Sequence, residues 1–196
     1  MSFATEIKRK LFHHLSLVYM VIYAISPLWL SLVILGLGLV VIAGVEFIRL
    51  RRPEVNAWFL AKFGGMHRES EVMRLSGIFW TLAGAWLTML IFTNKRIVLP
   101  ALGFLVFGDT LAALGGMKWG KHPWKSNPKK TLEGTACFAA VSALWALFFV
   151  RWPVAILGAL TTAWVEAQPF RWNDNFWIPL LGAMSLSIFN LVLGRK

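Results

Sequence analysis

The sequence has 196 residues, of which 58% are hydrophobic and only 15% charged, and its mean hydropathy is +0.64. In soluble domains about a quarter of the residues are charged, so this composition excludes a water-soluble fold. The net charge of +11 requires no nucleic-acid partner, because basic loops beside membrane spans account for it. The single cysteine, Cys137, excludes an intramolecular disulfide and a cysteine-based zinc site. The composition therefore predicts an all-α integral membrane protein.

Apolar segments recur along the whole chain and predict a bundle of about seven transmembrane helices. A span needs about 20 apolar residues, and prolines or polar stretches separate the segments. The first and sixth segments are short for a full crossing. We place the spans at residues 11–26, 28–48, 75–93, 96–115, 134–151, 153–168 and 175–194, within a single membrane-embedded domain covering residues 1–196.

The lysines and arginines are distributed unevenly between the two faces of this bundle. With the N-terminus inside, the cytoplasmic segments hold all but five of the twenty. The positive-inside rule therefore predicts a cytoplasmic N-terminus, in a multi-pass protein of the cytoplasmic (inner) membrane. The five basic residues expected at the opposite face are Lys95, Arg96, Arg151, Arg195 and Lys196.

The acidic residues gather at the same face as most of the basic ones, or one to two turns inside it. The positive-inside rule does not require this. A site that holds a polyanion through a metal ion would require it, because cations bind the phosphates and carboxylates bind the metal. The nine acids are Glu6, Glu46, Glu54, Glu69, Glu71, Asp109, Glu133, Glu166 and Asp174.

Asp109 lies inside an apolar segment, one residue after the run 104–107. Ionisable groups within a membrane are costly and usually face the bundle interior, a wet cavity or a partner charge. Glycines and alanines in 108–116 make this helix face small, so that a helix or ligand can approach closely. We expect Asp109 to be a Mg²⁺ ligand that is kept for the metal and not for stability. Small-residue packing around a buried ion pair is the alternative.

The stretch that follows is rich in glycine and lysine. Gly115, Gly120 and Lys121 have the spacing of a Walker A loop, but His122 replaces the required Ser or Thr and no strand precedes it. We therefore expect a flexible, cationic loop that binds phosphates and ends in 129–134, where the start of the next helix would add backbone donors. A loop that only sets topology or contacts anionic lipid is the alternative.

The first helix begins with Arg9 and Lys10, followed by His13 and His14. Arg9 and Lys10 are candidates for phosphate binding, with a role in topology alone as the alternative. The two histidines do not indicate zinc, because adjacent positions diverge around a helix and no third ligand is evident.

Three later helix ends also carry acids near the cytoplasmic face. Glu71 precedes the third span, and Glu166 lies near the cytoplasmic end of the sixth. Asp174 and Asn175 open the seventh span, where Asp174 is equally suited to cap the helix.

The order and spacing of these elements resemble the family of dolichol/polyprenol kinases, phytol kinases and CTP-dependent diacylglycerol kinases, distant relatives of phosphatidate cytidylyltransferases. The resemblance runs over almost the whole chain, although the stretch 117–130 does not match the family pattern and the chain is much shorter than eukaryotic dolichol kinases. The matching elements are Arg9, Lys10 and His13; Glu46 and Arg49; Glu71, Ser76 and Gly77; Gly108, Asp109 and Gly116; Lys130, Thr131, Glu133 and Gly134; Glu166; and Asp174, Asn175 and Pro179.

The resemblance implies a CTP-dependent lipid kinase that transfers a phosphoryl group to a membrane lipid alcohol (polyprenol/dolichol, phytol or diacylglycerol) at the cytoplasmic face, with Mg²⁺. Phosphoryl transfer depends mostly on positioning and charge neutralisation. Asp109 would hold the metal, assisted by Glu71 or Glu166, and Asp109 or Glu166 would accept the proton of the lipid hydroxyl. The residues expected to bind the nucleotide or its phosphates are Arg9, Lys10, Gly116, Lys130, Thr131, Glu133, Asp174 and Asn175.

Three other functions compete with this expectation. A cytidylyltransferase would make a CDP-lipid from the same nucleotide, but its His-Gly-Gly and Asp-Arg-x-Asp signature is absent from the sequence. A transporter or channel would need polar groups through the full depth of the membrane, whereas the acids here are confined to one side. A non-enzymatic assembly protein is the third alternative.

The predicted topology can be tested with single cysteines. A cysteine placed near residue 60 or residue 125 should be labelled only from the cytoplasm, and one placed near residue 95 only from outside, because the basic residues divide the loops in this way. Labelling of positions 60 and 95 from the same side would contradict the seven-span arrangement.

Overall fold

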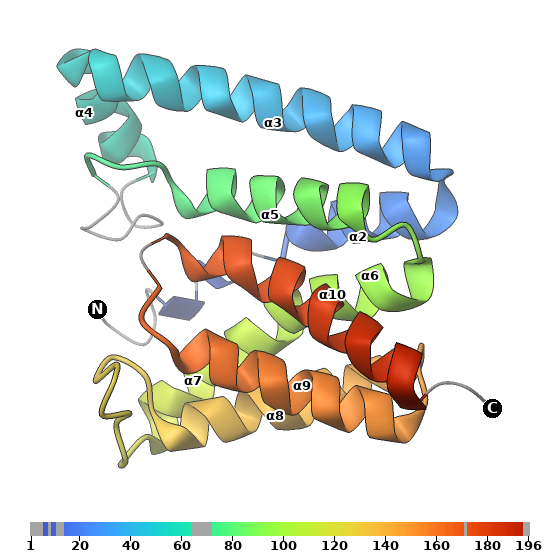
Figure 1. Ribbon diagram of the computed structural model, residues 1–196. Coiled ribbons are helices and arrows are strands. Elements are labelled where there is room, and N and C mark those ends of the chain that lie inside the picture. Colours follow the sequence, from blue (N-terminus) through green and yellow to red (C-terminus); the bar gives the residue numbers. More distant parts are fainter. Residues whose placement is uncertain (1–5, 8, 11–13, 64–71, 171, 194–196) are drawn as a thin grey trace.

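The computed structural model describes residues 6–193 apart from residues 8, 11–13, 64–71 and 171, and in these ranges the chain forms helices and loops without a β-strand. The longer helices lie roughly side by side, so the chain reverses at the two ends of a bundle (Figure 1). The helices are α2 (Ser16–Ile25), α3 (Leu28–Arg51), α4 (Pro53–Phe63), α5 (Gly77–Ile91), α6 (Lys95–Gly103), the π-helical turn η3 (Phe104–Gly108), α7 (Asp109–Trp119), α8 (Leu132–Ala146), α9 (Trp152–Ala167) and α10 (Asp174–Leu193).

A helix lies in each of the seven segments predicted from the sequence, with α6, η3 and α7 forming one of them. Within the described part of the chain, three helices are long and apolar enough to cross a membrane: Leu28–Arg51, Lys95–Trp119 and Asp174–Leu193. The shorter α2, α5 and α8 are also apolar. Helix α4 was not expected, because it lies in a segment predicted to be a polar connection. The number of crossings and the side of the N-terminus stay predictions.

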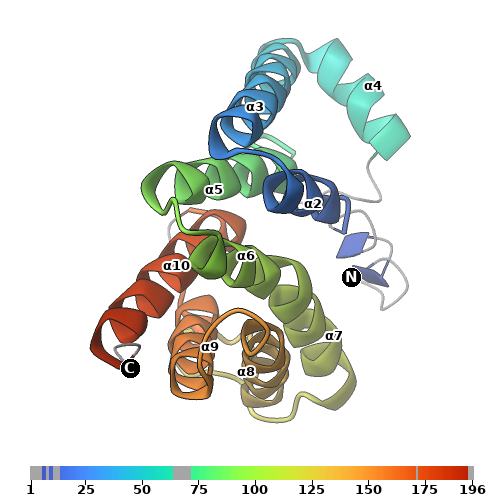
Figure 2. The same cartoon turned by 90° about the vertical axis from the view of Figure 1, so that its right-hand side faces the viewer.

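The helix Lys95–Trp119 runs through the middle of the bundle and is its most buried long helix (Figure 2). It is not a regular α-helix, because the amide of Asp109 donates to the carbonyl of Phe104, five residues earlier. Such π-helical turns insert one extra residue into a helix and are frequent at functional sites. The irregular turn therefore ends at Asp109, the carboxylate that the sequence singled out.

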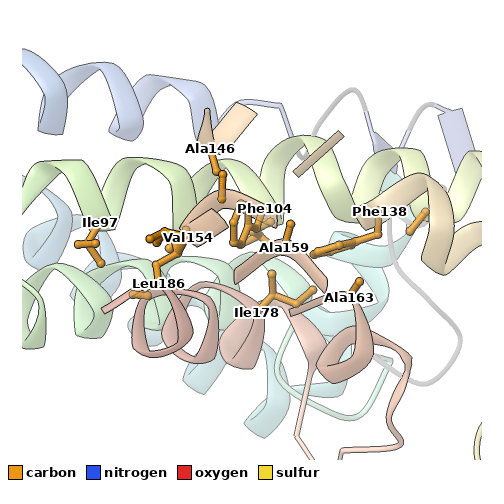
Figure 3. Close-up of a cluster of buried hydrophobic side chains, with 14 residues drawn as sticks. Ile97, Phe104, Phe138, Ala146, Val154, Ala159, Ala163, Ile178 and Leu186 are labelled. Atoms are coloured by element: carbon orange, nitrogen blue, oxygen red, sulfur yellow. The ribbon is translucent and has the colours of Figure 1, made fainter. Parts of the chain in front are cut away.

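The main hydrophobic core joins this central helix to α8, α9 and α10 (Figure 3). Phe104 and Phe138 are fully buried at its centre and meet edge to face, with ring centroids 6.5 Å apart. Most of the other core residues are alanines, valines and leucines. Small side chains let helices approach closely in an environment where lipid is as apolar as the core itself.

A second layer consists of α2, α3 and α5, and α3 lies at the outside of the bundle (Figure 2). Trp86 of α5 ties it to α3, because its indole nitrogen donates to the carbonyl of Leu32 at 3.0 Å. The outer face of α3 exposes large apolar side chains, among them Leu37, Val40 and Val41. An apolar helix exposed in this way is the arrangement expected for a lipid-facing span.

Helices α5 and α10 pack closely through Gly84. A Cβ atom at position 84 would lie 2.8 Å from both the Cα and the carbonyl oxygen of Phe176. Backbone atoms cannot move aside as a flexible side chain can, so this contact fixes the separation of the two helices.

Replacing Gly84 with alanine should therefore destabilise the fold. We expect Gly84→Ala to lower the free energy of unfolding by about 1–3 kcal/mol, the usual cost of overpacking. The matched control is Gly38→Ala in α3, where a Cβ would meet nothing within 4 Å. That change should be neutral or stabilising by up to about 1 kcal/mol, because alanine favours helix over glycine. Thermal unfolding in detergent measures both, and equal melting temperatures for the two variants would contradict the packing argument.

Candidate active site

Three carboxylates meet at one end of the bundle, although they come from separate helices. Asp109 begins α7, Glu166 lies in the last turn of α9 and Asp174 begins α10, and one oxygen from each lies within 4.8 Å of the others. Asp109 and Glu166 are buried, with exposed fractions of 4% and 2%. Three negative charges at such distances repel strongly unless cations lie among them. We call these three residues the acidic triad.

Lys10 neutralises the first carboxylate of the acidic triad. Its ammonium forms an ion pair with the Asp109 carboxylate and also donates to the Asp109 carbonyl at 3.1 Å. Both side chains are almost completely buried. Burial lowers the pKa of Lys10, although the carboxylate of Asp109 acts in the opposite direction. The sequence expectation that Asp109 is unimportant for stability therefore changes, because removing it would leave Lys10 buried without this partner.

Lys130 neutralises the other two carboxylates. Its ammonium pairs with Glu166 and lies 3.2 Å from an oxygen of Asp174. Burial alone would lower the pKa of Lys130, but the carboxylates of Asp174 and Glu166 outweigh it, and the pKa is raised. Lys130 therefore stays charged at any physiological pH.

The loop between α7 and α8 holds Lys130 in this place. Trp124 donates from its backbone to the Lys130 carbonyl at 2.9 Å and from its indole to Thr135 at 2.9 Å. Asn127 donates to the carbonyl of Ala167 at 3.3 Å, next to Glu166. The sequence predicted a flexible loop, whereas these bonds fasten it to both α8 and α9.

A cavity of about 230 Å³ opens beside the acidic triad, between α7, α8, α9 and the N-terminal segment. One side is polar, with acidic and basic groups, and the other is formed by small residues of α7 and α8. A side chain at Gly134 would meet the carbonyl of Ala112 at 2.7 Å, and one at Gly116 would meet the hydroxyl of Thr131 at 3.0 Å. The lining residues are Glu6, Arg9, Asp109, Ala112, Ala113, Gly116, Met117, Lys129, Lys130, Thr131, Gly134, Thr135 and Glu166.

Arg9 and Thr131 lie at this cavity, as their predicted roles require. The guanidinium of Arg9 pairs with Glu6, and its Nε donates to that carboxylate at 3.1 Å. The hydroxyl of Thr131 accepts from the amide of Gly134 at 3.1 Å and so caps α8. Glu6 was not predicted as a site residue, and only its membership of the one-sided group of acids distinguished it.

Three of the predicted site residues that the structure describes lie elsewhere or differ in their contacts. Glu133 is not in the cavity lining; its carboxylate contacts Nδ1 of His122 at 2.6 Å. The amide of Asn175 is directed to α5, where it donates to the carbonyl of Gly77 at 3.3 Å. Asp174, expected to bind phosphate or to cap α10, belongs to the acidic triad. Glu71, like His13, lies outside the described residues.

A neighbouring residue supplies a cap for α10. The side chain of Asn173 accepts from the amide of Asn175 at 3.0 Å. The carboxylate of Asp174 instead points to Lys130. The position before the helix therefore carries the capping group, and Asp174 is directed into the site.

The chain is similar in sequence to curated lipid kinases. The chain is 25% identical to CTP-dependent diacylglycerol kinase 1 of Saccharomyces cerevisiae, over 93% of this chain and 72% of that protein. It is 31% identical to dolichol kinase EVAN of Arabidopsis thaliana over 88% of this chain, which spans 33% of that protein. A phytol kinase of Synechocystis sp. is 29% identical over 55% of this chain and 51% of its own length. Curated relatives at 25–31% identity thus support this family of lipid kinases for the chain.

The relationship to these lipid kinases rests on sequence alone. No family model matches the chain, and no solved structure matches it. The residues that the resemblance singled out include Lys10, Asp109 and Lys130, which the structure brings to the acidic triad from distant parts of the chain.

The pairing of Lys10 with Asp109 predicts non-additive effects on stability. Lys10→Met and Asp109→Asn should each lower the free energy of unfolding by about 3–5 kcal/mol, because each removes one partner of a buried ion pair. The double variant Lys10→Met, Asp109→Leu removes both charges and should be close to wild type or more stable. Thermal unfolding in detergent measures the three variants. Single variants as stable as wild type would show that the pair is not buried as described.

Proposed function

We propose that this chain is a Mg²⁺-dependent CTP:lipid-alcohol phosphotransferase. The observation that carries the proposal is the acidic triad with its two lysines beside a cavity that Asp109, Glu166 and Lys130 line. Relatives named as CTP-dependent diacylglycerol kinase, dolichol kinase and phytol kinase support both the donor and the class of acceptor. The acceptor is accordingly the hydroxyl of a membrane lipid alcohol such as polyprenol/dolichol, phytol or diacylglycerol.

The acidic triad fits a magnesium ion. Mg²⁺ prefers oxygen ligands and is usually held by one or two carboxylates together with phosphate and water. Asp109, Glu166 and Asp174 offer such oxygens within 4.8 Å of one another. A bound Mg²⁺ would offset the negative charge of a triphosphate. Glu71, which the sequence also suggested as a ligand, stays a prediction.

The basic residues around the cavity suit the phosphates of the nucleotide. Arg9, Lys129 and Lys130 line it, and Lys10 lies directly behind Asp109. When a metal and a triphosphate bind together, the metal can take over the carboxylates and each lysine can exchange its carboxylate for phosphate oxygens. The cavity is smaller than the roughly 300–1,000 Å³ of sites that enclose a whole ligand. We infer that it takes the phosphate end of CTP and that the base lies outside it.

The lipid alcohol would reach this site sideways from the bilayer. Its hydroxyl needs a proton acceptor close to the transferred group, and Asp109 or Glu166 can serve. This arrangement fits a single catalytic domain, residues 1–196, with about seven spans and a cytoplasmic N-terminus in the inner membrane. The site would then face the nucleotide pool of the cytoplasm.

The position of a radioactive label in CTP separates this proposal from its main rival. With purified protein, Mg²⁺ and a lipid alcohol, label from the γ-phosphate should appear in the organic phase, because a kinase leaves a lipid monophosphate and CDP. Label from the α-phosphate should stay in the aqueous phase. The panel of acceptors is isoprenoid alcohols and diacylglycerol, with ATP as a second donor.

One control variant and one contradicting outcome complete the design of this experiment. The double variant Lys10→Met, Asp109→Leu is expected to fold yet transfer no label, because it lacks a ligand of the metal and a phosphate-binding cation. Label from the α-phosphate in the lipid, with release of pyrophosphate, would identify a cytidylyltransferase that makes a CDP-lipid and would refute the kinase.

A further inference from the structure

A second buried charge cluster lies at the end of α3, apart from the acidic triad. Arg49 is only 1% exposed, and its guanidinium donates to the carboxylate of Glu46 at 2.7 Å and to the side chain of Asn56 in α4 at 2.8 Å. It also donates to the carbonyls of Val72 at 3.0 Å and Arg74 at 2.7 Å. One guanidinium thus joins α3, α4 and the segment that leads into α5.

The same cluster fixes the beginning of α5. Glu46 accepts a hydrogen bond from the amide of Ser76 at 3.2 Å, and Ser76 caps α5 with its own hydroxyl. A buried ion pair costs desolvation free energy and is weak evidence for stability, whereas it can specify one geometry. The contacts of Glu46 indicate that what the ion pair specifies is the position of α5.

Helix α5 in turn fixes the beginning of α10. The carbonyl of Gly77 accepts from the side-chain amide of Asn175, and Gly84 allows the backbone of Phe176 to lie against α5. Asn175 is 7% exposed and follows Asp174 directly in the chain. A shift of α5 would therefore displace the residue beside an acid of the triad.

We propose that Glu46, Arg49 and Asn175 are positioning residues that set Asp174 within the acidic triad through the first turns of α5 and α10. The proposal rests on the function proposed above, since it assigns the triad to a divalent cation. The three residues act on the triad through the backbone of residues 76, 77 and 174. Asn175, expected from the sequence to bind phosphate, here has the role of a tie between two helices.

The test measures Mn²⁺ binding to the detergent-solubilised chain, without nucleotide or lipid, by electron paramagnetic resonance. Bound Mn²⁺ changes the resonance signal of the free ion. If the double variant Lys10→Met, Asp109→Leu no longer causes this change, the bound Mn²⁺ is assigned to the acidic triad. Asn175→Ala should weaken Mn²⁺ binding about tenfold, the usual scale for groups that support a metal ligand. The matched control is Trp86→Phe, which also removes one side-chain hydrogen bond between helices, to the carbonyl of Leu32, but should leave the Mn²⁺ affinity unchanged.

A second variant, Glu46→Gln, keeps the test decisive if Asn175→Ala does not fold. It should also weaken Mn²⁺ binding, and the double variant Glu46→Gln, Asn175→Ala should lose less affinity than the product of the two single losses, because both act along one connection. The proposal would be overturned if the double variant lost as much Mn²⁺ affinity as the product of the two single losses. So would a lower melting temperature without any loss of Mn²⁺ affinity, or wild-type protein that binds no Mn²⁺.

Activity assays distinguish a failure of this inference from a failure of the proposed kinase. If the wild type binds Mn²⁺ and the variants behave as expected, positioning is supported even when no label passes from CTP to a lipid. If label is transferred while the Asn175→Ala variant keeps wild-type Mn²⁺ affinity, the kinase stands and the positioning role is refuted.

Discussion

The structure depends on a balance of charge inside an apolar bundle. Three carboxylates that would repel one another are paired with two lysines. Lys10 pairs with Asp109, and Lys130 pairs with Glu166 and Asp174, so positive charge lies among acids that come within 4.8 Å of one another in a medium of low dielectric constant. Each lysine comes from a segment outside the long helices, one from the N-terminal region and one from the α7–α8 loop. The peripheral segments therefore complete the interior, and the ion pairs join residues that are 36 to 99 positions apart in the sequence.

Small residues allow these charges to meet. Glycines 84, 116 and 134 each lie where a Cβ would approach another segment to between 2.7 and 3.0 Å. Helices that approach so closely leave little freedom in the position of their ends. The site is therefore built on packed helix ends, and the loop with Lys130 is fastened to them by hydrogen bonds. Such support is what a site that relies on positioning and charge requires.

The sequence contained enough information for the helices and for part of the site. Long apolar runs located α3, the central helix and α10, and a lone acid within such a run identified Asp109. Helix α4 was missed because its eleven residues begin in a charged stretch and have no clear amphipathic pattern. The close approach of Asp174 to Asp109 and Glu166 was also missed, since its partner Lys130 is 44 residues away and no local pattern records that contact. For the same reason the sequence suggested capping by Asp174, a function in which Asn173 serves.

The π-helical turn before Asp109 has a consequence for the way this family can vary in length. Each residue of an α-helix advances the side-chain direction by about 100°. A π-helical turn takes up one extra residue within about one turn, so loss of one residue between Phe104 and Gly108 would restore a regular helix and leave Asp109 directed at Lys10. Loss of one residue from the regular helix α6 would instead rotate Asp109 by about 100° relative to the preceding half. Evolutionary deletions should therefore be tolerated in the turn 104–108 more readily than in α6.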